Sequence, residues 1–156
     1  PPGSLGRLAR KGATGCGYLG AGSKRQCVQD GWNLTGDAFS MDADGYFFYQ
    51  ARTDDMIVSA GYNIAGPEVE SALLAHPAVA ECGVVGVPDE ERGQIVKAVV
   101  VLREGQAPSE ALARELQDFV KRTIAPYKYP RAVEFAAALP RTETGKLQRF
   151  RLRQAG

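Results

Sequence analysis

Two apolar segments decide the fold: VAECGVVGV at Val79–Val87 and QIVKAVVVL at Gln94–Leu102. Runs rich in valine and of this length are typical of β-strands, because branched side chains pack well on a pleated surface. The second run is almost continuously apolar, which indicates a strand buried on both faces or nearly so. We therefore expect both segments to lie in one sheet at the centre of the second half of the chain.

Helical patterns flank these strands. Pro67 suits the first turn of a helix, and the pair His76-Pro77 ends it. Ser109 can cap a second helix, whose apolar residues recur at helical spacing until Pro126. A short strand at Val133–Phe135 and a last helical turn or two at Leu147–Arg153 complete the order. The pattern predicts an α+β fold over residues 54–156, a small mixed β-sheet flanked by helices.

Residues 1–53 differ in character and predict a separate β-rich segment. They hold many glycines and short strand-like runs, with a strong hairpin signal at Asp44-Gly45 before the aromatic run Tyr46–Tyr49. The stretch before it, Gly31–Asp37, predicts a short extended segment that ends in a turn. The adjacent acids Asp54 and Asp55 are poor strand formers, so we expect a joint there.

Composition excludes several classes of function. The 156 residues are 44% hydrophobic and 24% charged with a net charge of +1, so no strong field favours nucleic acid or an anionic membrane. No apolar run approaches the roughly 18 residues of a membrane span, and no signal peptide opens the chain. We expect a cytoplasmic protein. Three cysteines, Cys16, Cys27 and Cys82, match no zinc spacing and predict free thiols and no metal site in this chain.

Two phosphate-binding patterns occur in incomplete form. Gly15–Gly20 (GCGYLG) matches a dinucleotide fingerprint, but the loop-like sequence after it offers no helix N-terminus to hold a pyrophosphate. Gly145-Lys146 resembles the end of a P-loop, yet Pro140 and Leu147 occupy positions where that motif needs other residues. What survives is a lysine on a glycine-containing polar loop, able to reach a phosphate or a carboxylate.

Other candidate residues are ambiguous when each is taken alone. Asp37 follows Gly36 and could bind a ribose diol, although a turn-capping aspartate is the simpler interpretation. Lys146 could equally be a solvated surface lysine. The order of the motifs is more specific than any one of them. They are Trp32-x-x-Thr35-Gly36-Asp37, Asp44-Gly45-Tyr46, Arg52-x-Asp54-Asp55-x-Ile57, Gly61-Tyr62-Asn63-Ile64, the Pro67 helix, and Pro140-Arg141-Thr142-x-Thr144-Gly145-Lys146.

This series resembles the C-terminal portion of the adenylate-forming superfamily, which includes acyl-CoA synthetases, adenylation domains of peptide synthetases and firefly luciferase. Residues Ala60–Glu70 and Ala125–Arg131 are most similar to benzoate–CoA and 2-aminobenzoate–CoA ligases, with medium-chain acyl-CoA synthetases close behind. The resemblance implies a two-step reaction. A carboxylic acid attacks the α-phosphate of ATP to give an acyl-adenylate, and the thiol of coenzyme A then displaces AMP.

The resemblance also implies a role for each matching residue. Asp37 and Arg52 would bind the ribose or phosphate of ATP and AMP, and Asp54 would be the hinge about which residues 54–156 swing between the steps. Lys146 would be the catalytic residue, bridging the carboxylate and the α-phosphate in the adenylation step. Its cation would stabilise the charge that develops in that transition state.

After the swing, the CoA-binding residues would be Ala60, Gly61, Tyr62, Asn63, Arg92 and Lys121. The first three would line the pantetheine passage, and Arg92 and Lys121 would hold the phosphates of the CoA nucleotide. Some relatives carry an arginine where this chain has Asn63, so the chain departs from the family pattern at this contact. The phosphate loop, the acid pocket and the Mg2+ ligands of the family lie in a large N-terminal domain outside this chain. We therefore expect the chain alone to be inactive.

Three alternatives remain. The chain could belong to an adenylation domain that loads a carrier protein, in which case Arg92 and Lys121 would meet no CoA nucleotide. It could be a non-catalytic module that binds CoA or a partner protein, although Asp37 and Lys146 are not needed for packing. It could also be a purely structural α+β domain, for which the sequence gives no positive support.

Overall fold

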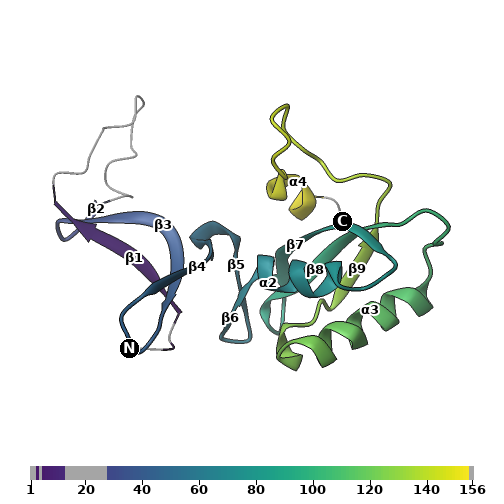
Figure 1. Ribbon diagram of the computed structural model, residues 1–156, viewed down its shortest axis with the longest axis horizontal. Coiled ribbons are helices and arrows are strands. Elements are labelled where there is room, and N and C mark those ends of the chain that lie inside the picture. Colours follow the sequence, from purple (N-terminus) through teal and green to yellow (C-terminus); the bar gives the residue numbers. More distant parts are fainter. Residues whose placement is uncertain (1–2, 4, 13–27, 155–156) are drawn as a thin grey trace. The chain divides into compact units, whose positions relative to one another are not determined.

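The computed structural model describes residues 3, 5–12 and 28–154 of the chain. The chain divides into two compact units, Pro1–Asp54 and Asp55–Gly156 (Figure 1). Each unit is described by itself below. The glycine pattern at Gly15–Gly20 and two of the cysteines, Cys16 and Cys27, lie outside the described residues.

The first unit is an antiparallel sheet built around one long strand. Strand β3 (Trp32–Met41) pairs with β1 (Leu5–Lys11), with the short β2 (Val28–Gln29) and with β4 (Phe47–Arg52). The hairpin expected at Asp44-Gly45 is confirmed and joins β3 to β4. The Asp42 carboxylate accepts hydrogen bonds from the backbone N–H groups of Asp44 and Tyr46, at 3.0 and 2.9 Å, and Gly45 has a φ of +88°.

The prediction of a turn at the end of Gly31–Asp37 is wrong. These residues continue into β3, and the glycine produces a bulge instead of a chain reversal. Arg7 of β1 lies opposite Ala38, but two residues later Ala9 lies opposite Leu34, so β3 carries extra residues between these pairs. Gly36 there has a φ of +79°, a conformation that glycine adopts without steric cost.

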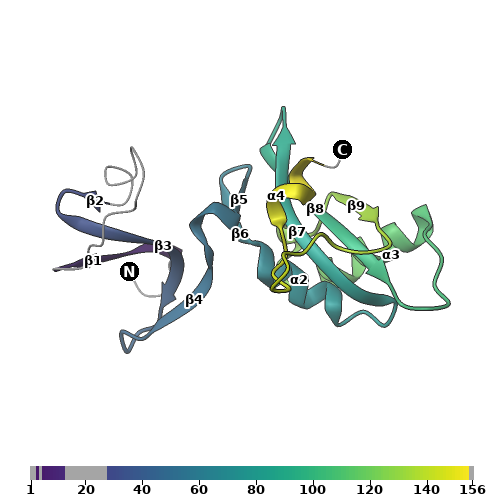
Figure 2. The ribbon, with the colours of Figure 1, turned by 90° about the horizontal axis from the view of Figure 1, so that it is seen from above.

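The second unit has the expected α+β fold, with helices packed on a small mixed sheet (Figure 2). A 3-10 turn η1 (Thr53–Asp55) leads into the hairpin of β5 (Met56–Ser59) and β6 (Tyr62–Ala65), followed by helix α2 (Gly66–Leu74). Strands β7 (Val79–Asp89) and β8 (Gly93–Leu102) are antiparallel, and β9 (Ala132–Phe135) lies parallel to β8. The remaining elements are α3 (Glu110–Thr123), η2 (Pro126–Lys128) and α4 (Arg149–Gln154).

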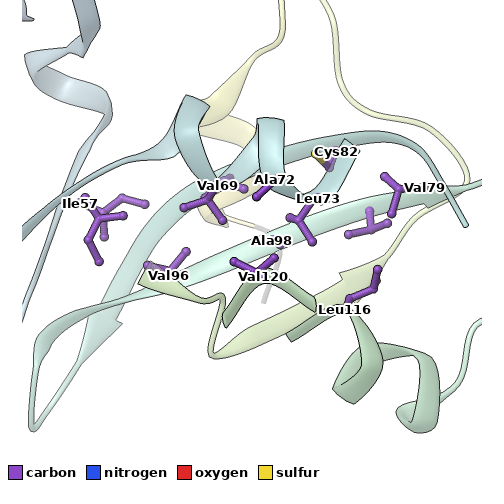
Figure 3. Close-up of a cluster of buried hydrophobic side chains, with 13 residues drawn as sticks. Ile57, Val69, Ala72, Leu73, Val79, Cys82, Val96, Ala98, Leu116 and Val120 are labelled. Carbon is purple, nitrogen blue, oxygen red and sulfur yellow. The ribbon is translucent and has the colours of Figure 1, made fainter. Parts of the chain in front are cut away.

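The sheet β7-β8-β9 buries apolar residues on both faces, as the sequence predicts for β8. On one face Leu73 of α2 and Val120 of α3 pack with Ala98 of β8 (Figure 3). On the other face Val85 and Val99 pack with Leu139 and with Leu152 of α4. Figure 1 shows α4 above this sheet and α3 below it. Leu147, the residue after Lys146, also packs on this second face.

Local chemistry explains where the elements begin and end. The Ser109 hydroxyl accepts a hydrogen bond from the N–H of Leu112 at 3.1 Å, which caps α3 as expected. Pro67 occupies the first turn of α2, where a missing N–H costs nothing. Strand β7 lies at the edge of its sheet, and the carboxylate of Glu70 from α2 accepts the N–H of Val84 at 2.9 Å. This bond satisfies an edge donor that would otherwise lack a partner.

Candidate functional site

Lys146 lies on a short, ordered hairpin. The backbone N–H of Thr142 donates to the carbonyl of Lys146 at 2.8 Å, and the N–H of Gly145 donates to the carbonyl of Thr142 at 2.9 Å. The three-residue loop ends at Gly145, whose φ is +82°, the arrangement of a type I turn followed by a left-handed residue. The Thr142 hydroxyl also accepts the N–H of Lys146 at 3.0 Å. The glycine before the lysine is thus a requirement of the turn.

Side chains fasten the Lys146 hairpin (Arg141–Leu147) to the rest of the unit. The Arg141 guanidinium donates to the carbonyl of Gly145 at 2.9 Å and to the carboxylate of Glu81, on β7, at 2.6 Å. Three residues after the lysine, Arg149 donates to both oxygens of Glu70 at 2.8 Å. The hairpin is therefore held by ion pairs before and after Lys146.

A glycine beneath the hairpin allows a close approach. A Cβ added at Gly83 of β7 would lie 2.6 Å from a methyl carbon of Leu152 and 3.1 Å from one of Leu147. These distances are shorter than ordinary van der Waals contact. The bare backbone at Gly83 lets the segment 147–152 settle directly on the sheet.

In the first unit, Asp37 and Arg52 lie opposite each other on β3 and β4. Arg52 Nε lies 3.3 Å from Asp37 Oδ1, and both side chains remain accessible to solvent. A Cβ at Gly36 would meet the Arg52 guanidinium at 3.2 Å. The pair presents a carboxylate acceptor and a guanidinium donor side by side, a combination suited to a diol or a phosphate.

Asp54 is exposed in the turn η1, at the last position of the first unit. The next residue, Asp55, is fixed in the second unit by ion pairs with α4. Its carboxylate lies 3.2 Å from Arg153 Nη2 and 3.9 Å from Arg149 Nη1. The compact packing of the second unit therefore begins directly after Asp54.

The structure joins several of the expected CoA-binding residues at the β5–β6 hairpin. Ala60 and Gly61 form its two-residue turn with φ values of +49° and +81°. The N–H of Ala60 donates to the carbonyl of Arg92 at 2.9 Å. Asp89 orders the turn that contains Arg92, because its carboxylate accepts a hydrogen bond from the Arg92 N–H at 2.8 Å. Asn63 is exposed on β6, next to Tyr62.

Two tyrosines that carried no assigned role in the sequence contact expected CoA-binding residues. Tyr127 of η2 stacks on Tyr62 with ring centroids 4.5 Å apart. The Nζ atom of Lys121 lies 4.4 Å from the ring centroid of Tyr129, and Arg131 donates to the Tyr129 hydroxyl at 2.9 Å. Alternating aromatic and basic residues at 127–131 were the signal that could have found them, because cations bind aromatic faces.

Burial raises the pKa of the Cys82 thiol, which packs on the face of the sheet that α2 covers. Desolvation raises the pKa of Cys82 from 9.0 to about 12, with the Glu70 carboxylate adding to the rise. Cys82 is a free, buried cysteine next to Gly83. Over residues 3, 5–12 and 28–154 no group of three or more His, Cys, Asp or Glu side chains is placed to hold a metal ion. Within the same ranges no helix has the length and apolar character needed to cross a membrane.

Comparison with known sequences identifies the family. Residues 68–146, just over half of the chain, match the AMP-binding enzyme C-terminal domain. The chain is 46% identical to 4-hydroxybutyrate–CoA ligase 1 of Metallosphaera sedula over 88% of its own length, and 50% identical to the mitochondrial acyl-coenzyme A synthetase ACSM5 of Homo sapiens over 87%. It spans about a quarter of each of these relatives, 24% in both cases.

Solved structures give the same result. The anthranilate CoA ligase AuaEII, solved with anthranoyl-AMP, is 43% identical and aligns with a TM-score of 0.81 over 99% of this chain and 30% of its own. The o-succinylbenzoate CoA synthetase MenE of Bacillus subtilis, solved with its acyl-adenylate, is 35% identical with a TM-score of 0.82 over 100% of this chain and 32% of its own. The chain belongs to the AMP-binding enzyme C-terminal domain family of the adenylate-forming acyl-CoA synthetases.

Proposed function

We propose that this chain is the C-terminal part of an AMP-forming carboxylic acid–CoA ligase. One observation carries the proposal: an exposed lysine on a hairpin ordered by its glycine, its threonine and two flanking ion pairs. A flexible surface lysine needs no such support. A cation that must meet a developing negative charge does, because preorganised donors stabilise a transition state without reorganisation.

In the first step Lys146 bridges the carboxylate of the acid and the α-phosphate of ATP. The carboxylate oxygen attacks the phosphorus, the bond to pyrophosphate breaks, and the acyl-adenylate forms. Asp37 accepts hydrogen bonds from the ribose hydroxyls, and Arg52 donates to the ribose or to a phosphate. Their 3.3 Å ion pair orients both side chains in the absence of nucleotide. The Mg2+ that accompanies ATP supplies charge neutralisation, and we place its ligands outside this chain.

In the second step the unit after Asp54 rotates and presents the β5–β6 hairpin. Ala60, Gly61 and Tyr62 line the passage of the pantetheine arm, and the open backbone at Gly61 leaves room for it. Arg92 and Lys121 hold the nucleotide phosphates of CoA, with Asn63 beside them. The thiol sulfur attacks the acyl carbon, and AMP leaves. Residues 1–53 then form the end of a large N-terminal domain, and 54–156 its mobile lid.

For the acid, we propose an aryl carboxylate of the benzoate or 2-aminobenzoate kind. The support is the 43% identity to a ligase solved with anthranoyl-AMP. Relatives that act on other acids are equally similar, such as the 4-hydroxybutyrate ligase at 46%. The acid pocket lies outside this chain in the proposal, so the assay below uses both classes.

The test is a half-reaction assay on the full-length protein that carries this chain. Adenylation is followed by exchange of labelled pyrophosphate into ATP and overall turnover by AMP release in the presence of CoA, with a panel of benzoates and fatty acids, for wild type and Lys146→Ala. We expect activity on an aryl acid, and adenylation lowered by about 100- to 1000-fold in the variant, the usual effect of removing one transition-state donor. Thioester formation from supplied acyl-adenylate should be kept.

One control variant and the pattern of losses separate the possible failures. Lys146→Arg keeps the charge but changes its shape, and we expect partial activity. Full adenylation by Lys146→Ala would remove Lys146 from the mechanism. Adenylation without CoA-dependent turnover would favour a carrier protein as the acyl acceptor, and no adenylation of any acid would leave a non-catalytic binding module.

A further inference from the structure

We infer that Arg141 and Glu81 form a clamp that positions Lys146 for adenylation, an inference that rests on the proposed function. Neither residue touches a substrate in this proposal. Each acts through the hairpin and is a positioning residue. The Arg141 guanidinium donates one hydrogen bond within the hairpin and one to strand β7.

One bond goes to the peptide that carries the lysine. Arg141 Nη1 donates to the carbonyl of Gly145 at 2.9 Å, and this carbonyl belongs to the peptide bond between Gly145 and Lys146. The other bond leaves the hairpin: Arg141 Nη2 donates to Glu81 Oε2 at 2.6 Å. A single planar guanidinium thus ties the peptide before Lys146 to strand β7. Rotation of that peptide, which would swing the lysine side chain, breaks a charge-assisted bond.

The sheet places Glu81 where the clamp needs it. The pairing of β7 with β8 shifts between Val79 and Glu81, which is a bulge at the start of the edge strand. Beyond the bulge, Glu81 falls on the same face as Gly83 and Val85, the face on which Leu152 packs. Bulges commonly re-aim a side chain next to a functional site. Glu81 therefore points to the side of the sheet that the hairpin occupies.

The Arg141–Glu81 pair is exposed, so we expect it to orient the Lys146 hairpin more than it stabilises the fold. The side chains of Arg141 and Glu81 are 45% and 49% accessible, whereas those of Arg149 and Glu70 are 23% and 14% accessible. Exposed ion pairs contribute little to the stability of a fold. The packing of this face is supplied by Leu139, Leu147 and Leu152. Loss of the clamp should leave the fold intact and free the tip of the hairpin.

A mobile hairpin tip would slow adenylation, because the step depends on where the Lys146 ammonium lies. A cation contributes to the first step only if its nitrogen reaches the oxygens on which charge develops, and a misplacement of about 1 Å can slow a reaction roughly 100-fold. The second step uses the β5–β6 hairpin and not Lys146. Loss of the clamp should therefore slow adenylation and spare thioester formation, a split that a general loss of stability would not produce.

The experiment compares Arg141→Ala, Glu81→Ala and the double variant in the full-length protein. The matched control is Arg114→Ala, which breaks an exposed arginine–glutamate pair with Glu110 on α3, at 3.2 Å. Adenylation is followed by exchange of labelled pyrophosphate into ATP, thioester formation from supplied acyl-adenylate and CoA, and stability by thermal unfolding. Arg141→Lys tests the bridging geometry, because one ammonium cannot replace the planar guanidinium that spans the Gly145 carbonyl and the Glu81 carboxylate.

We expect Arg141→Ala to lower the rate of adenylation about 10-fold and Glu81→Ala somewhat less, as for a partly misplaced catalytic group. The double variant should be no worse than Arg141→Ala, since Glu81 acts only through the arginine. Thioester formation, the unfolding midpoint and the Arg114→Ala control should match wild type.

Several results would overturn the clamp. They are full adenylation by Arg141→Ala, equal loss in both half-reactions, or additive losses in the double variant. Lys146→Ala is assayed in parallel and shows whether the clamp alone or the proposed role of Lys146 has failed. If it loses adenylation while Arg141→Ala keeps it, the clamp alone is wrong. If Lys146→Ala keeps adenylation, or if wild type adenylates no acid, the proposed role of Lys146 and the clamp are overturned together.

Discussion

The β5–β6 hairpin and the Lys146 hairpin are built differently although both turn on a glycine with positive φ. The first has a two-residue turn at Ala60-Gly61, and a backbone bond to Arg92 fixes it. The second has a longer loop whose position depends on the side chains of Thr142 and Arg141. The first exposes bare backbone, and the second exposes a long cation.

This difference matches what each proposed half-reaction needs. A thiol arm needs close approach to a rigid backbone, which paired strands provide. A lysine has several rotatable bonds, so its turn must be fixed by additional contacts if the ammonium is to reach one place. Changes at each hairpin should therefore affect different half-reactions, and Gly61→Val and Gly145→Ala test that separation.

The largest effect concerns Cys82, which packs with α2 on the face of the sheet opposite the Lys146 hairpin. Because burial raises the pKa of this thiol to about 12, very little thiolate exists at pH 8 in the folded state. We expect alkylation of Cys82 to be about 1000-fold slower in the native protein than in the unfolded chain, from the thiolate fraction alone. Peptide mapping by mass spectrometry after iodoacetamide treatment resolves it from the other two cysteines. Rapid native labelling would mean that this face of the sheet opens.

The same shift predicts alkaline sensitivity. The folded thiol keeps its proton above pH 9.0, where the unfolded chain loses it, so its contribution to stability is complete below pH 9.0 and is lost as the pH rises to about 12. Denaturant unfolding of wild type and Cys82→Ala over this range should show the steeper loss in wild type. If the free energy of unfolding falls equally with pH in both proteins, the raised pKa of Cys82 does not contribute to the loss.

The next effect should appear at the β5–β6 hairpin with Gly61→Val. The change places a branched side chain at a φ of +81° and into the open space where we propose that the pantetheine arm passes. Thioester formation from supplied acyl-adenylate should fall by about 100-fold, as for a misplaced reactant, with adenylation kept. Gly105→Val is the matched control, because Gly105 has a φ of +83° and similar free space but lies before α3. An equal loss in the control would assign the effect to strain.

A smaller effect is expected in the opposite half-reaction with Gly145→Ala. The turn requires φ of +82° there, and an L-residue in that region costs about 1–2 kcal/mol, so the loop should shift. We expect adenylation to slow about 10-fold while thioester formation is unchanged. If Gly145→Ala impairs both half-reactions equally, the two hairpins do not have separate roles.

Much of the fold could be predicted from the sequence because local signals and packing agree. The valine-rich strands, the Ser109 cap and the Pro67 helix start all lie where the patterns place them. The exception is the turn expected at Thr35–Asp37. A glycine followed by an aspartate predicts a chain reversal, but the pairing of β3 with two neighbouring strands outweighs that local preference and leaves only a bulge.

The candidate site was less accessible to sequence reasoning. Motif order named Arg141 and Lys146, but Glu81, the ion-pair partner of Arg141, lies 60 positions away from it in the chain. No local pattern links two such residues, because only the packing of the hairpin on β7 brings them together. The stacking of Tyr62 on Tyr127 is of the same kind. Residues that support a site through tertiary contact become visible only in the folded chain.

The smallest effect is expected from Ala60→Gly, and it has the opposite sign. Ala60 holds a φ of +49°, which strains an L-residue, so glycine should relieve about 1–2 kcal/mol while adding roughly 0.5–1 kcal/mol of unfolded-state entropy. The net result should be a gain of between zero and about 1.5 kcal/mol in the free energy of unfolding, measured with denaturant. Ala111→Gly in α3 is the control and should be destabilising, because helical alanine carries no such strain. If Ala60→Gly is stabilising yet slows thioester formation, the strained alanine is retained because it keeps the turn rigid. If both stability and rate rise, rigidity at Ala60 has no part in the second step, and the backbone bond to Arg92 alone fixes the hairpin.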